Sequence, residues 1–376
     1  MKKVNKSVKA YKGFNKYMQC TPNGEIFQYE IGKEYKEDEA NLCHCGFHAC
    51  ENPLDVLSYY NNIDDKFCEV ELDEIDPNRN RDSKICGKKI KIGIEIGFLG
   101  LFKAGIEWIK NKTIFTKEDF KKLPSGHNAK IGSSGNDAKI GSSGNDAKIG
   151  SSGNDAKIGS SGDGVKIGSS GDGAKIGSSG DHARIGSSGD YVQIGSSGDD
   201  AKISSSGNYA QIGSSGYNVK IGSSGDDAKI GSSSDNAKIG SSGDGAKIGS
   251  SGDYVQIGSS GNYAQIGSSG YNVQIGSSGD YVQIGSFGHN AKIGSSGDDA
   301  KIGSSGDDCV IMCAGINSSA KAKIGSWITL AEWKYSEEKQ KYIPFSVVTK
   351  QVDGIEIKED VYYTLQDGKF KESEQQ

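Results

Sequence analysis

An isoleucine recurs at every ninth position from Ile131 to Ile311, 21 times without an insertion or deletion. It closes a unit that usually runs Gly-Ser-Ser-Gly-x-x-Ala-Lys-Ile, in which Ala is sometimes Val and is Cys at position 309. A flexible Gly/Ser linker has no reason to keep an apolar residue in phase, because it buries nothing. The period therefore predicts a folded array in which neighbouring units stack on one another.

Alternation within the unit predicts one short strand per repeat. Ala or Val, Ile and the first Ser point inward, and Lys or Gln points outward. Nine residues are too few to close a coil, so we predict a mainly β protein containing a two-sheet β-solenoid with about 18 residues per coil. The second Ser, the Gly and the two variable residues form the corner, where we expect Gly to adopt positive φ. About ten coils would give a rod of about 50 Å.

The chain is predicted to have three parts: an α+β head domain over 1–122, the solenoid over 123–311 and a small β cap over 312–376. Such a cap would cover the open sheet edges at the end of the last coil. In the head, Asn52 is expected to cap a helix that begins at Pro53. Head strands are expected over 10–14, 26–31, 67–72 and 88–96, a second helix over 100–112, and cap strands over 327–335, 342–352 and 360–365.

Charge and hydropathy exclude several classes of function. The net charge is −5, and positions 126–311 contain 19 Asp against 13 Lys and one Arg, which disfavours a nucleic-acid-binding face. No apolar run is long enough for a membrane helix, and no apolar segment of a signal peptide follows the first residues. We therefore expect a cytoplasmic protein of a bacterial or phage-infected cell, with free thiols, no membrane contact and no cofactor.

The head contains a cluster of potential metal ligands in Cys43-His44-Cys45-Gly46-Phe47-His48-Ala49-Cys50. Cys43, Cys45, His48 and Cys50 could in principle bind zinc through thiolates and imidazole. The spacing lacks the paired C-x2-C knuckles of zinc sites, so partly buried free cysteines are the main alternative. His48 is also a candidate catalytic base, against a structural role as a hydrogen-bonded residue.

Three stretches of the head carry a resemblance to a known family. They are Tyr11-Lys12-Gly13-Phe14, the run from Phe27 to Tyr35, Phe-Gln-Tyr-Glu-Ile-Gly-Lys-Glu-Tyr, and the run from Gly46 to Leu57, Gly-Phe-His-Ala-Cys-Glu-Asn-Pro-Leu-Asp-Val-Leu. Together they resemble an uncharacterised module of phage, prophage and Firmicutes-type bacterial proteins. Such proteins often carry Gly/Ser-rich short repeats and an Ile-Thr-Leu-Ala-Glu-Trp segment like that at 328–333. The resemblance implies family membership and no established activity.

The same region also resembles ADP-ribosyltransferase-like folds, which bind nicotinamide in a pocket between two strands and a tyrosine-bearing helix. The positions that match are Tyr11, Gly13, Phe47, Tyr59 and Tyr60. The resemblance implies a nucleotide site with His48, Tyr11 and Tyr59 as candidate catalytic residues. The chain departs from that pattern on the first strand, where Tyr11-Lys12 replaces the usual catalytic histidine or arginine.

Aromatic residues in the variable positions of the repeat are candidates for a partner-binding surface. The strongest group is Tyr254, Tyr263, Tyr271, Tyr281 and Phe287. Block duplication is the alternative explanation, since the same tyrosine-containing cassettes occur twice in the same order. The sequence as a whole favours a non-enzymatic structural or interaction protein, with a protein partner or self-association, whose rod spaces or displays the head. An enzyme with a nucleotide-binding head on a solenoid scaffold is the alternative.

Overall fold

The computed structural model describes residues 7–78, 82–113 and 126–373. The chain divides into two compact units, residues 1–108 and 109–376. The predicted boundary between 122 and 123 lies outside the described residues. Within the described ranges, no helix combines the length and the apolar composition needed to cross a membrane. The eight cysteines are all free thiols.

The N-terminal unit is built on a five-stranded antiparallel sheet in the order β4-β7-β5-β1-β6. The long strand β7 pairs with β5 through its first residues and with β6 through its later ones, so β1, β5, β7 and β6 close on themselves. Ala10, Phe14, Phe47, Val70 and Ile90 fill the interior. The strands are β1 Val8–Phe14, β4 Glu34–Lys36, β5 Phe47–Cys50, β6 Lys66–Ile75 and β7 Lys84–Glu95.

The predicted α+β character of the head is confirmed, with differences in detail. The segment after Asn52 is a 3-10 helix, η2 Pro53–Ser58, and Asn52 caps it by accepting a hydrogen bond from the Leu54 amide at 3.2 Å. The second helix is α1, Gly97–Thr113. The strand expected over 26–31 shrinks to β3, Phe27–Gln28, which forms a hairpin with β2, Gln19–Cys20, around η1, Pro22–Gly24.

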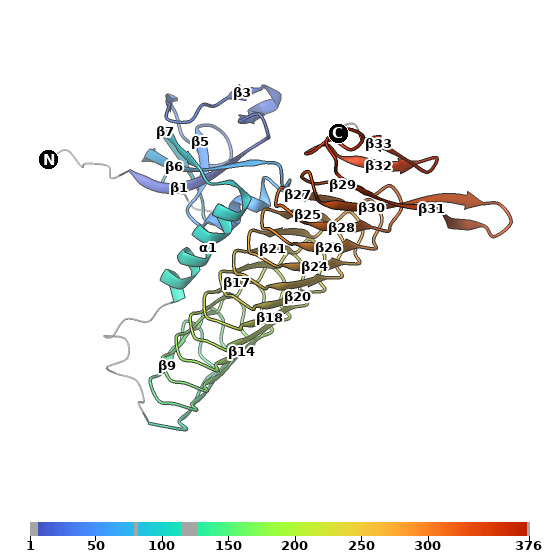
Figure 1. The fold of residues 1–376 in the computed structure, drawn as a ribbon. Helices are drawn as coiled ribbons and strands as arrows, with labels where there is room; N and C mark the ends of the chain where they lie inside the picture. The colour runs from blue at the N-terminus through green and yellow to red at the C-terminus, as the bar shows by residue number, and fades with distance from the viewer. Residues whose placement is uncertain (1–6, 79–81, 114–125, 374–376) are drawn as a thin grey trace. The chain divides into compact units, whose positions relative to one another are not determined.

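The repeat region forms 21 four-residue strands, as Figure 1 shows from green to orange. They are β8 Lys130–Ser133, β9 Lys139–Ser142, β10 Lys148–Ser151, β11 Lys157–Ser160, β12 Lys166–Ser169, β13 Lys175–Ser178, β14 Arg184–Ser187, β15 Gln193–Ser196, β16 Lys202–Ser205, β17 Gln211–Ser214, β18 Lys220–Ser223, β19 Lys229–Ser232, β20 Lys238–Ser241, β21 Lys247–Ser250, β22 Gln256–Ser259, β23 Gln265–Ser268, β24 Gln274–Ser277, β25 Gln283–Ser286, β26 Lys292–Ser295, β27 Lys301–Ser304 and β28 Val310–Cys313.

Alternate strands belong to two different sheets, which confirms the predicted solenoid in which two consecutive repeats make one coil. Strands β8, β10 and so on to β28 form the first solenoid sheet, and β9, β11 and so on to β27 form the second. All pairs are parallel and in register, so that Ile149 lies between Ile131 and Ile167. Identical residues therefore stack one above another along the rod, and each isoleucine contacts its own copies in the neighbouring coils.

The interior of the solenoid matches the predicted inward set. From Ile140 onward the repeat isoleucines are at most 4% exposed, and the Ala or Val two positions earlier is essentially inaccessible from Ala147 onward. The first Ser of each unit is also buried from Ser142 onward. In the first coil, Ala129, Ile131 and Ala138 are only partly buried. The solenoid core is thus a continuous column of aliphatic side chains with a parallel column of serines.

The corner differs from the sequence-based expectation in where positive φ falls. The left-handed residue is the second variable one, for example Asp227, Tyr209 and Asn218 with φ of 54°, 57° and 55°. The corner Gly, such as Gly225, does not adopt positive φ. It is required because a Cβ there would overlap the carbonyl oxygen of Gly207 in the preceding coil. Close stacking of backbones, and not backbone conformation, thus explains this glycine.

The first variable residue links one coil to the next. The Asp190 amide donates to Oδ1 of Asp172 at 2.9 Å, and the Asn208 amide donates to Oδ1 of Asp190 at 2.8 Å. The same bond recurs from coil to coil along both corners. The corner Asp and Asn side chains therefore join successive coils and do not form local turn bonds.

The C-terminal residues extend both solenoid sheets and close the end of the rod, as the red segment in Figure 1 shows. These strands are β29 Ser319–Lys321, β30 Trp327–Ser336, β31 Lys341–Gln351, β32 Tyr363–Gln366 and β33 Lys369–Glu372. Ala320 takes the place of the repeat isoleucine beside Ile302. A further copy of the repeat motif Ala-Lys-Ile-Gly-Ser, at 322–326, does not form a coil, because Ile324 is 53% exposed. Antiparallel β31 and β33 end the two ladders.

Candidate functional site

The N-terminal unit contains a pocket of about 350 Å³ that brings together distant parts of the sequence. Its walls come from β1, from β5, from the segment that begins with η2 and from the start of β7. Tyr11, His48 and Tyr59, the three residues predicted as catalytic candidates, all line it, as does Cys50. This pocket is a concave site lined by both polar and aromatic side chains.

Gly13 and Tyr60 fix the shape of one wall. A side chain at Gly13 would overlap the ring of Tyr60, so the glycine allows this ring to lie flat against β1. The Tyr60 hydroxyl donates to the Cys20 sulfur at 2.9 Å. Burial is the main cause that raises the pKa of Tyr60, so its hydroxyl stays protonated at neutral pH. Tyr60 therefore offers a neutral aromatic surface.

His48 lies on β5 with its ring already engaged. Its Nε2 accepts a hydrogen bond from the Cys43 backbone amide at 2.9 Å. Burial, together with the nearby positive charges of Lys84 and Lys12, lowers the pKa of His48 to about 4. The imidazole is therefore neutral at pH 7, with the proton on Nδ1. Because Nε2 is occupied, His48 would have to lose the Cys43 bond to act as a general base.

Two lysines give the pocket a positive character. Lys12 is only 9% exposed, and its Nζ donates to the His48 carbonyl at 2.9 Å while lying 5.5 Å from the centre of the Tyr29 ring. Lys84 lies over the Tyr59 ring with its Nζ 4.5 Å from the centroid. The Tyr59 hydroxyl donates to Asp82. These contacts hold cations beside aromatic faces, an arrangement suited to an anionic ligand with a flat ring.

The pH dependence of the N-terminal unit should report the state of His48. An unfolded histidine titrates near pH 6.5, whereas His48 titrates at about 4 when folded. Between these values the unfolded chain binds a proton that the folded chain does not, so stability is retained above pH 6.5 and falls as pH drops toward 4. In His48→Gln this part of the pH dependence should disappear from urea-unfolding curves.

An NMR titration of the imidazole in the intact chain measures the same quantity directly. In Lys84→Gln the pKa of His48 should rise, because one neighbouring positive charge has been removed. A His48 that titrates near 6.5 in the wild-type protein would contradict the buried environment described above.

The predicted metal ligands are not assembled into a metal site. In the described ranges, no three His, Cys, Asp or Glu side chains come together as a metal ion requires. Cys50 is buried in the pocket wall, whereas the exposed Cys43 contacts His48 through its backbone amide. The Cys45 carbonyl accepts from the Cys86 thiol at 3.0 Å. An isolated β-bridge between Asn41 and Cys45 closes a turn here. This turn explains the clustering of the cysteines and histidines better than metal coordination does.

The predicted partner-binding aromatics lie on two different corners of the solenoid. Tyr263 and Tyr281 precede strands of the second sheet and stack with ring centroids 5.1 Å apart, as do Tyr191 and Tyr209 at 4.9 Å. Tyr254 and Tyr271 precede strands of the first sheet and meet edge to face at 6.3 Å. Phe287, 52% exposed, lies on the turn that leads toward the first sheet. The residues therefore do not make one continuous row.

Lys12 and Lys84 line the pocket of the N-terminal unit, but the sequence did not predict a role for them there. A signal for Lys12 exists, because it has the same phase as Ala10 and Phe14, which are both buried on the inner face of β1. A lysine at an inward position is unusual unless it has partners. Lys84 has no comparable signal, since it is brought to the pocket only by the pairing of β7 with β5.

Residues 8–104 match the family model described as a domain of unknown function (DUF7666). The match covers β1 to β7 and the pocket described above. No curated protein and no solved structure shows significant similarity to the chain. The comparisons thus agree with an uncharacterised N-terminal module and assign it no activity.

Proposed function

We propose that this chain is a non-enzymatic structural or interaction protein in which a rigid solenoid spaces or displays the N-terminal domain. The observation that carries the proposal is the unbroken register of the repeat strands, in which each isoleucine pairs with its counterpart in a neighbouring coil. A stacked array of this kind builds a long rod and needs no catalytic residues to do so. We further propose that the protein is derived from a phage or prophage, which the resemblance of the head to modules of such proteins supports. Its proposed location is the bacterial cytoplasm.

The spacer role can be tested by removing four coils in register. Deleting residues 191–262 joins Asp190 to Tyr263, which has the same corner position as Tyr191 and likewise stacks on a tyrosine of the next coil. We expect the shortened chain to fold, and X-ray scattering should show the solenoid shorter by about 19 Å. The thermal unfolding of the N-terminal domain should not change. A shortened chain that loses its β structure, or keeps its length, would contradict a modular spacer.

A second function, a nucleotide-binding or enzymatic head, is favoured by one observation. The pocket of the N-terminal unit places Tyr11, His48 and Tyr59 around one cavity with Lys12 and Lys84. Calorimetry of the full chain with NAD+ tests this alternative. Saturable binding that is lost in Tyr11→Ala and kept in His182→Gln, a change on an exposed corner of the solenoid, would support it. Absence of binding at millimolar NAD+ would reject it.

A further inference from the structure

The outer face of the first solenoid sheet carries a row of seven consecutive cations. Adjacent members pair in parallel register, so each lies one strand from the next. All seven are exposed, and none forms an ion pair with a described residue. Six strand spacings give the row a length of about 29 Å. Its members are Lys130, Lys148, Lys166, Arg184, Lys202, Lys220 and Lys238, and we name them the cation row.

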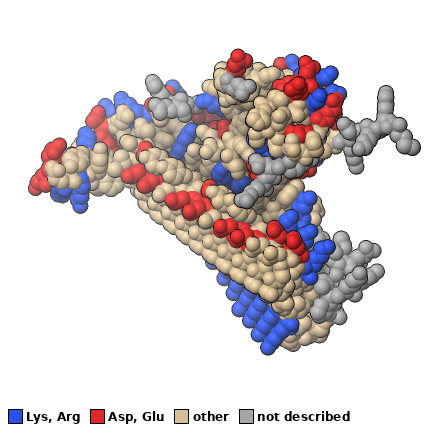
Figure 2. Space-filling view, turned by 180° about the vertical axis from the view of Figure 1, so that it is seen from behind, with Lys and Arg blue, Asp and Glu red and all other residues tan. Residues whose placement is uncertain are grey.

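The cation row is separated from the negative charges of the solenoid. Lysines lie on the strand faces, whereas the aspartates lie at the corners, where their side chains accept amide hydrogen bonds from the next coil. Figure 2 shows basic side chains gathered in rows near the end of the rod, apart from lines of acidic side chains that run along it. The acidic net charge of the repeat region therefore conceals a locally basic face.

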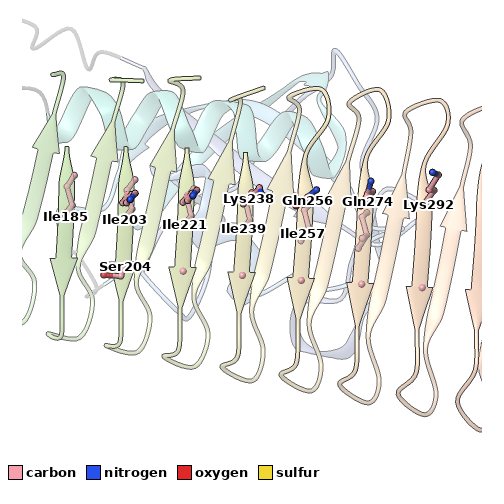
Figure 3. Close-up of a pocket in the computed structure, with 18 of the residues that line it drawn as sticks. Ile185, Ile203, Ser204, Ile221, Lys238, Ile239, Gln256, Ile257, Gln274 and Lys292 are labelled. Atoms are coloured by element: carbon pink, nitrogen blue, oxygen red, sulfur yellow. The ribbon is translucent and has the colours of Figure 1, made fainter. Parts of the chain in front are cut away.

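A flat floor lies beside the cation row. The next outward position on the strands of the first solenoid sheet is glycine, except for Ser204 and Met312. A side chain at Gly222, Gly240 or Gly258 would have no atom within 4 Å. Figure 3 shows Lys238, Gln256, Gln274 and Lys292 in one row that runs across successive strands, with Ser204 at the level of the neighbouring row. The exposed second serines, such as Ser242 and Ser260, form the far side of this floor. The resulting trough is open to solvent, has a volume of about 1380 Å³ and extends from Lys166 to Met312.

The cation row destabilises the folded solenoid through repulsion between neighbouring charges, and the fold does not require a cation at these positions. Like charges one strand apart repel by about 1 kcal/mol in water, and side chains directly opposite each other in a sheet feel this repulsion. The repeat tolerates glutamine at the same position, as at Gln256 and Gln274. A bound anion would offset the repulsion and release condensed counterions from its own chain.

We propose that the trough of the first solenoid sheet binds a linear anionic polysaccharide. The cation row would pair with acidic groups spaced roughly every 5 Å, and the serine hydroxyls with Gln256 and Gln274 would hydrogen-bond sugar hydroxyls. Trp327, 44% exposed, continues the same outward row beyond Val310 and offers a ring face to a sugar. Single-stranded nucleic acid suits the trough less well, because successive bases need aromatic platforms, and the floor is glycine.

The proposal is tested with the full chain and oligogalacturonate, which carries one carboxylate per sugar. We expect binding that weakens as salt rises from about 50 to 200 mM. The triple variant Lys166→Gln, Arg184→Gln, Lys202→Gln should bind at least about tenfold more weakly, with a salt slope smaller by about 2. Gln is native at equivalent positions, so the variant should fold. The methyl-esterified oligomer should not bind.

A matched control removes the same charge elsewhere: Lys339→Gln, Lys341→Gln, Lys369→Gln changes exposed lysines of the C-terminal strands and turn. This control should bind like the wild type. Equal loss in both variants, or no binding by the wild type, would overturn the proposal. Tighter binding of oligo-dT through the same cations would overturn the choice of a polysaccharide. The proposal rests on the interaction role of the rod, whereas the four-coil deletion tests the spacer role separately.

Discussion

Replacing Gly225 with alanine is expected to destabilise the solenoid by about 3 kcal/mol or more. The added methyl group would overlap the carbonyl oxygen of Gly207 in the preceding coil, and this oxygen belongs to a backbone that cannot move without breaking the stack. The expected result is a lower urea midpoint for the solenoid transition, measured by circular dichroism on the full chain.

Gly222, three residues earlier in the same repeat, provides the matched control. A methyl group there would enter open space on the outer face of the first solenoid sheet. Gly222→Ala should therefore be neutral or stabilise slightly, since it reduces the freedom of the unfolded chain. Equal effects of the two substitutions would contradict the close contact of successive corners.

Replacing Ile230 with alanine should have the second large effect, about 2 to 5 kcal/mol. Ile230 is completely buried and lies between Ile212 and Ile248 in the column of the second solenoid sheet. Because each coil contacts only its neighbours, a cavity in a middle coil weakens the interfaces on both sides. Denaturant unfolding should show either a lower midpoint or a second transition.

Two substitutions calibrate this result. Ile230→Val removes one methyl group and should cost about 0.5 to 1.5 kcal/mol. Gln256→Ala changes an exposed, uncharged residue of the first sheet and should have an effect within about 0.5 kcal/mol. An Ile230→Ala effect no larger than that of Gln256→Ala would mean that the isoleucine column does not stabilise the fold.

The phase of one residue type was sufficient to predict the solenoid. Because Ile131 to Ile311 never lose register, the sequence predicted two sheets, two repeats per coil and the inward set, which the structure confirms. It did not predict that Ala320 would replace an isoleucine in the last coil, since the Ala-Lys-Ile-Gly-Ser at 322–326 imitates the repeat. The pairing of β29 with β27 and the exposure of Ile324 distinguish the two.

The corner and the charge pattern could not be read from residue types alone. The glycine at each corner suggested a positive φ. Glycine is instead required there because successive corners approach so closely that a side chain would overlap the backbone of the preceding coil. The left-handed conformation falls on the second variable residue, such as Tyr209. Summed charge likewise suggested an acidic surface. The sequence placed lysine on the strand face and the variable residues at the corner, but it did not predict that stacking would align Lys148, Lys166 and Arg184 in one row.

Some of the residues that line the candidate pocket could be predicted from the sequence, but the chemistry of the pocket could not. Tyr11, His48 and Tyr59 were singled out individually, and the structure places them around one cavity. The hydrogen bond from the Cys43 amide to His48 and the approach of Lys84 depend on a turn and a strand pairing that are remote in the sequence. Burial and the charge of Lys84 keep His48 neutral, and the Cys43 amide engages its ring.

Hydrogen exchange of the intact chain, followed by mass spectrometry across positions 126–311, tests the central claim most directly. In the folded solenoid, strand amides bond to carbonyls of the preceding coil, as the Lys220 amide does to the Ala201 carbonyl at 2.9 Å. Peptides from the middle repeats should therefore remain protected long after exposed segments have exchanged. Exchange throughout the repeats at the rate of an unstructured Gly/Ser chain would contradict the rod.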